Sequence, residues 1–140
     1  MSIKQLTVFV ENKAGNISEI TELFAKNNVD MKALSIADTK DFGILRIIAN
    51  DPERALEVLK AHGFIGKITE VIGVKISNRT GELSKALSAL AKSGVNVEYL
   101  YAFLAGTVDS AYVVLKATDG ARAETVLREA GFKEIEGLAK

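Results

Sequence analysis

Two short glycine-containing loops hold the residues of this chain best suited to binding a small molecule. The first covers residues 11–17 (ENKAGNI) and the second covers residues 77–83 (SNRTGEL). A glycine lets a ligand approach the backbone closely, and the unpaired N–H groups at a helix start carry a partial positive charge that suits a carboxylate. A tight turn that binds nothing would use the same glycines and asparagines, so the residues alone leave both interpretations open.

The residue types needed for catalysis or metal binding do not form a recognisable pattern. His62 is the single histidine and stands before Gly63 at a predicted helix end, where an imidazole commonly interacts with exposed carbonyls. The chain contains no cysteine, no glycine-rich phosphate loop and no nucleophile elbow. Acidic residues near the loops stand at expected strand ends and helix starts, where capping explains them. We therefore expect a protein that is not an enzyme and has no metal or cofactor.

An internal repeat places the two loops at equivalent positions. Residues 8–34 align with residues 74–100 at an offset of 66 residues, and glycine and asparagine of both loops coincide. After a two-residue insertion, residues 49–64 align with residues 117–132 at an offset of 68. The same unit is therefore expected twice.

Each copy is predicted to contain a strand, a helix, two strands, a helix and a strand, from its hydrophobic periodicity and its turn residues. Asn16 is expected to cap the first helix, and Pro52 suits the first turn of the second helix because its missing N–H costs nothing there. In the first copy the predicted elements are strand 6–10, helix 17–24, strands 30–37 and 42–49 joined by a turn at 38–41, a helix from Asp51 to Gly63, and strand 68–71.

This order of elements predicts an α+β protein with two tandem ferredoxin-like βαββαβ copies, residues 1–71 and 72–140. In such a unit, two helices cover one face of a four-stranded antiparallel sheet. One unit of this size buries only about 60% of its chain surface and would be marginal alone. Because residues 69–76 join the copies without a linker, we expect the copies to pack as one rigid body.

The two loops resemble the loop of the ACT domain. In that family the loop reads Asn, Lys or Arg, often Pro, then Gly and an apolar residue. Residues 12–17 and 78–83 follow this order, with Ala14 and Thr80 where proline is frequent.

The openings of the strands that follow the first helix of each copy resemble the same family. Residues 28–31 (NVDM) and 94–97 (GVNV) stand where ACT domains show Gly-Val-Asn-Ile, with Asp30 in place of the usual asparagine. The resemblance covers essentially the whole chain, twice.

Membership of this family implies a βαββαβ fold and a regulatory protein. It also implies an amino acid or related metabolite bound at the seam between two ACT units, and partnership with a metabolic enzyme or regulator. The ligand-binding residues implied by the resemblance are Asn12, Lys13, Ala14, Gly15, Asn16, Ile17, Asp30 and Met31 in the first copy, and Asn78, Arg79, Thr80, Gly81, Glu82, Leu83, Asn96 and Val97 in the second.

Aromatic residues of the second copy support a rival hypothesis. Tyr99, Tyr101 and Phe103 alternate along a predicted strand and share one face, which Tyr112 of the next strand joins; the alternate residues between them face the helices. RNA-recognition modules hold bases on such a face of an open ferredoxin-like sheet. Burial of this face against a second sheet, within the chain or in a homodimer, is the alternative we favour, and a structural dimerisation domain without a ligand is the third hypothesis.

The composition indicates a folded protein without a charged partner. Hydrophobic residues make up 48% of the 140 residues, and 18 basic residues balance 18 acidic ones. This balance gives no electrostatic reason to expect nucleic acid or a membrane as partner. Lys4 and Gln5 interrupt the first apolar residues, so we expect no signal peptide and a cytoplasmic protein.

The two sites implied by the family are not expected to bind equally. We assume that the loop of each copy faces the second strand of the other copy. The first loop, with Asn16 at its helix start, then meets Asn96, whereas the second loop, with Glu82 in that place, meets Asp30. Like charges disfavour a ligand carboxylate at the second site, so the first site is predicted to bind more tightly.

Overall fold

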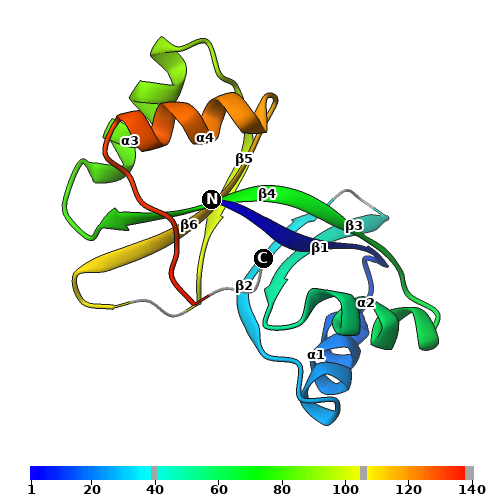
Figure 1. The fold of residues 1–140 in the computed structure, drawn as a ribbon. Coiled ribbons are helices and arrows are strands. Elements are labelled where there is room, and N and C mark those ends of the chain that lie inside the picture. The colour runs from blue at the N-terminus through cyan, green and yellow to red at the C-terminus, as the bar shows by residue number, and fades with distance from the viewer. Residues whose placement is uncertain (39–40, 105–106, 138–140) are drawn as a thin grey trace. The chain divides into compact units, whose positions relative to one another are not determined.

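The computed structural model describes residues 1–38, 41–104 and 107–137 of the chain. These residues form two compact units, each built from strands and two helices (Figure 1). The N-terminal unit contains residues 4–69. The C-terminal unit contains residues 70–137 together with residues 1–3 from the start of the chain.

The N-terminal unit has the predicted order of elements. Its strands lie in the order β2-β3-β1-β4, with β1 and β2 both antiparallel to β3. Residues 39 and 40 of the predicted hairpin turn lie outside the described residues. The elements are β1 (Ser2–Glu11), α1 (Asn16–Lys26), β2 (Met31–Asp38), β3 (Phe42–Ala49), α2 (Pro52–Ala61) and the beginning of β4 (Ile65–Ser77).

The C-terminal unit repeats the first five elements of this order. The second part of β4 is its first strand, and its sheet has the strand order β4-β6-β5, all antiparallel. The ferredoxin-like α+β class predicted for both copies is confirmed. The further elements are α3 (Glu82–Lys92), β5 (Val97–Ala102), β6 (Ser110–Ala117) and α4 (Gly120–Glu129).

The final strand predicted for the second copy is absent from the described residues. After α4, Lys133 makes a single bridge to Lys75, and residues 134–137 form no strand. The edge of β4 is instead occupied by the start of the chain, where the carbonyl oxygen of Met1 accepts a hydrogen bond of 2.8 Å from the N–H of Gly73. Each position on the edge of a strand can pair with only one neighbour. The start of the chain already occupies the edge of β4 at Gly73, so the predicted final strand cannot pair there.

Each unit has its own apolar core between its helices and one face of its sheet. In the N-terminal unit, Ile20, Leu23 and Phe24 of α1 pack on alternate residues of β1 and β3. The helix start predicted at Asp51 is confirmed, since its side chain accepts a hydrogen bond from the N–H of Arg54. None of the described helices is long and apolar enough to cross a membrane.

The predicted faces of the second copy are confirmed by strand register, but the predicted burial is only partly observed. Leu100 pairs with Leu115, which belongs to the core beneath the helices, so its side chain lies on the helix face. It is nevertheless exposed, as is Leu104, because β5 is the edge strand of its unit.

Candidate ligand-binding loops

The two strand-to-helix loops have the same backbone geometry. Gly15 and Gly81 stand directly before α1 and α3 with φ angles of 91° and 89°. A Cβ added at either glycine would meet nothing within 4 Å, so the requirement for glycine here is conformational rather than steric. The N–H groups of Asn12 and Asn78 each donate a hydrogen bond of 2.9 Å to the carbonyl oxygen of an aspartate. The repeat in the sequence is therefore also a repeat in loop structure.

Neither helix start is capped by a side chain. The prediction that Asn16 caps α1 is wrong: Gly15 occupies the capping position, and the Nδ2 of Asn16 donates to the carbonyl oxygen of Glu11 at 2.8 Å. In the part of the chain that the structure describes, the N–H groups of Ile17 and Leu83 have no acceptor. Each loop therefore presents free N–H groups at the positive end of a helix.

Asp30 and Met31 lie at the other end of the sheet from the first loop. At one end of β3, Phe42 pairs with Glu11 beside the loop, and at the other end Ala49 pairs with Met31. An extended strand of this length separates the two places by roughly 23 Å.

The C-terminal unit separates its predicted site residues in the same way. Val97 pairs with Ala117 at one end of β6, whereas Ser110, at the other end, pairs with Ser77 beside the second loop. Each unit thus brings together its loop residues and keeps them apart from the residues that open its second strand.

Three charged residues of the predicted sites, Lys13, Asp30 and Glu82, have ion-pair partners of opposite charge. The pairs are Lys13–Glu11 (3.4 Å), Lys32–Asp30 (2.6 Å) and Lys85–Glu82 (2.9 Å). The two carboxylates expected to repel a ligand are therefore partly compensated. Among the described residues, no group of three or more histidine, cysteine, aspartate or glutamate side chains lies close enough together to hold a metal ion.

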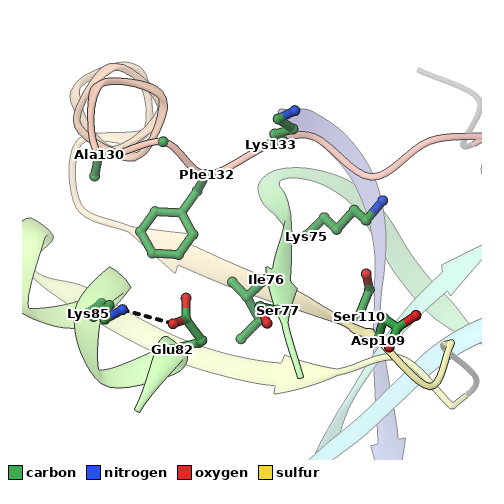
Figure 2. A pocket seen from close by; sticks show the side chains of 11 residues that line it. Lys75, Ile76, Ser77, Glu82, Lys85, Asp109, Ser110, Ala130, Phe132 and Lys133 are labelled. Atoms are coloured by element: carbon green, nitrogen blue, oxygen red, sulfur yellow. Dashed lines mark hydrogen bonds and ion pairs between the residues drawn. The ribbon is translucent and has the colours of Figure 1, made fainter. Parts of the chain in front are cut away.

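Each unit also contains a cavity that the sequence did not indicate. It lies where the unit's first strand ends, beside the start of the next helix and the segment after the second helix. Its volume is about 280 Å³ in the N-terminal unit, where Lys13 and Asn16 border it, and about 450 Å³ in the C-terminal unit, where Glu82 borders it (Figure 2).

The other lining residues are distant from the loops in the sequence, so neither hydrophobic periodicity nor the loop motif indicates that they line a cavity. A comparison of the aligned copies does distinguish some of these residues, because three lining positions change from large apolar to polar residues. These are Phe9, Phe42 and Ile65 in the first copy, and Lys75, Ser110 and Lys133 in the second.

The aromatic residues of the second copy share one face, as predicted. Tyr101 pairs with Val114, and the N–H of Phe103 donates to the carbonyl oxygen of Tyr112. The rings of Phe103 and Tyr112 pack edge to face with centroids 5.6 Å apart. Both rings are half-buried, so part of this surface is used inside the unit rather than offered for base stacking.

The chain belongs to the family of ACT domain pairs, whose model matches residues 1–139. A solved structure of a protein from Bacteroides thetaiotaomicron is 40% identical to it, covers 96% of this chain and 92% of that one, and superposes with a TM-score of 0.90. The resemblance detected in the loops is thereby confirmed.

Two further solved structures share the fold at 15% identity. The ligand-free regulatory subunit of aspartate kinase from Thermus thermophilus has a TM-score of 0.66, with 91% of this chain and 92% of that chain covered. The regulatory subunit of aspartate kinase from Thermus flavus has a TM-score of 0.62, with 93% and 95% covered. No protein with a curated description matches this chain.

Proposed function

We propose that this chain is a regulatory module that binds an amino acid or a related metabolite between two ACT units. The observation that carries this proposal is the duplication of one loop geometry, with a left-handed glycine and unpaired helix N–H groups, in an ACT domain pair. Two neighbours in fold are regulatory subunits of aspartate kinase, which supports a role in regulation.

In this proposal a ligand contacts a loop from one unit and the opening of the second strand from another. The reason is the separation of the two groups of residues within each unit, which prevents one unit from supplying both. The first site combines residues 12–17 with Asn96 and Val97, and the second combines residues 78–83 with Asp30 and Met31.

The ligand's carboxylate is expected at the helix start of each loop. The free N–H groups of Ile17 and Leu83 are suitable donors, and the helix dipole adds to the attraction. Neither loop supplies a nucleophile or a general base with a partner, so we propose that the ligand leaves unchanged and that the output is a change in a metabolic enzyme or another regulator.

Thermal unfolding in the presence of each of the twenty amino acids tests this function. A ligand present at 100 times its Kd stabilises the native state by about 2.7 kcal/mol, which raises Tm measurably. Asn12→Ala or Asn78→Ala should reduce the rise, whereas Ser88→Ala, an exposed position in the middle of α3, should leave it unchanged. A rise that survives both loop substitutions together would contradict the proposed sites.

We also propose a cytoplasmic homodimer that covers the apolar part of the outer sheet faces. Phe9, whose side chain is 43% exposed, and Ile44 pair across β1 and β3 on such a face. Sedimentation equilibrium should give twice the monomer mass, and Phe9→Ser should shift the equilibrium toward monomer. A monomeric wild-type protein at micromolar concentration would exclude this arrangement.

A further inference from the structure

The larger of the two equivalent cavities has an unusual distribution of charge. In Figure 2, Lys75 and Lys133 lie to one side of the Phe132 ring and the Lys85–Glu82 ion pair lies to the other. The cavity of about 450 Å³ is large enough for a small metabolite, and Phe132 supplies an apolar surface within it.

Lys75 and Lys133 form a pair of neighbouring like charges. The N–H of Lys75 donates to the carbonyl oxygen of Lys133 at 2.8 Å, and the two residues are bridge partners. Directly opposed residues in an antiparallel bridge have Cβ atoms roughly 5 Å apart, and like charges there are destabilising. Among the described residues, neither ammonium group has a carboxylate within the 4.0 Å of an ion pair.

The N-terminal unit provides an internal comparison. Its cavity is built by the same elements in the same places, but Phe9 and Ile65 stand where the C-terminal unit has Lys75 and Lys133. The fold therefore does not require lysine at these positions. An anion between the two ammonium groups would remove their repulsion, which explains a lysine pair that the architecture itself does not need.

We propose that the cavity of the C-terminal unit binds a small metabolite through one oxyanion group, a carboxylate or a phosphate, held between Lys75 and Lys133. The short carbon skeleton of the metabolite lies against Phe132, and a polar substituent reaches the Lys85–Glu82 pair. A second acidic group is disfavoured because Glu82 and Asp109 border the same cavity. This site lies within one unit, and Glu82 is the one residue that it shares with the second proposed loop site, residues 78–83.

Amide spectra of the labelled full chain, titrated with lactate or glycerol 3-phosphate at constant ionic strength, test the proposal. The two probes carry a carboxylate and a phosphate on a three-carbon skeleton, and chloride is the control anion. At about 10 mM, which fills most of a millimolar site, the N–H signals of residues 131–133 should move and saturate. The signals of the equivalent residues 63–65 should not move, and the comparison of the probes identifies the preferred oxyanion.

Lys75→Gln and Lys133→Gln should each weaken this binding at least about tenfold, because each removes one of the two charges that hold the anion. Lys92→Gln, an exposed lysine in the last turn of α3, is the matched control and should bind as the wild type does. Unchanged dispersion of the remaining signals shows that a variant is folded. If only one of the two variants folds, that variant is enough to test the proposal.

Absence of saturable shifts at residues 131–133 with both probes would overturn the proposal. Equal shifts with chloride, or equal weakening by Lys92→Gln, would overturn it as well. Binding of an amino acid at the first loop is read at Gly15, which lies in the other unit and does not border this cavity. Shifts at Gly15 therefore report on the regulatory function, and shifts at residues 131–133 report on the anion site.

Discussion

The backbone N–H of Gly73 donates a hydrogen bond of 2.8 Å to the carbonyl oxygen of Met1. Through this bond the first residues of the chain line the edge of the strand that begins the second copy. The side chains of Ile3 and Ile135 then meet over Gly73, where a Cβ would lie 2.8 Å and 3.2 Å from their Cδ1 atoms. The C-terminal unit is therefore completed by residues from both ends of the chain.

Gly73→Ala should destabilise the protein by about 1 kcal/mol, at the low end of overpacking costs, because the new methyl group must displace the Cδ1 atoms at the ends of the Ile3 and Ile135 side chains. Urea unfolding of wild type and variant measures the difference. Gly120→Ala is the control: its added Cβ meets nothing within 4 Å at the first position of α4, where alanine favours a helix. Equal effects of the two substitutions would exclude the steric explanation.

Removal of the side-chain cap of α2 or of α4 should lower the free energy of unfolding by the same amount. Asp51 and Asp119 accept hydrogen bonds of 3.2 Å and 3.1 Å from the N–H groups of Arg54 and Arg122. Asp51→Ala and Asp119→Ala should each lower the free energy of unfolding by about 1 kcal/mol. Glu57→Ala, an exposed position within α2, should change it by less than about 0.5 kcal/mol. A cap variant as stable as this control would show that the cap contributes nothing.

Acid should weaken the C-terminal unit through Glu124. Hydrogen bonds from the α-amino group of Met1 and then from Arg128 hold the pKa of Glu124 below its ordinary value of 4.5. The folded state therefore favours the ionised carboxylate, and this contribution is complete above pH 4.5 and is lost as the pH falls through the lowered pKa.

Urea unfolding from about pH 6 to about pH 3 measures this loss. Glu124→Gln should be less stable than wild type near neutral pH and should show a smaller decrease on acidification. Glu129→Gln, an exposed position at the end of the same helix, should follow the wild-type curve. Identical pH profiles for Glu124→Gln and wild type would contradict the assignment.

The two loops are expected to bind an amino acid with unequal affinity. Asn16 is neutral at the start of α1, whereas Glu82 occupies the same position in α3 and is compensated only by the exposed Lys85. A ligand carboxylate should therefore bind more tightly at the first loop. In calorimetry, Asn12→Ala should remove the tighter binding and Asn78→Ala should leave it. The opposite pattern would refute either the assumed pairing of loops and strands or the electrostatic argument.

The sequence by itself determined the repeated unit, the order of its first five elements and the family. These features depend on local signals: alternation of apolar residues, glycines with positive φ before α1 and α3, and aspartates such as Asp51 that cap helices. Such signals act within a few residues of the chain, so a single sequence contains them. The positions of the two loops follow from the same local rules.

Tertiary structure alone decided which residues complete the C-terminal unit and which side chains meet in its cavity. Met1 bonds to β4 at Gly73 and Lys133 bonds to the same edge at Lys75, and the sequence pattern near Lys133 contains no information about a segment more than a hundred residues earlier. In the same way, Leu100 lies on the helix face and is still exposed, because β5 has no further neighbour. Pairing between distant segments depends on which partner packs best against an edge in the folded chain, and no local pattern encodes that choice.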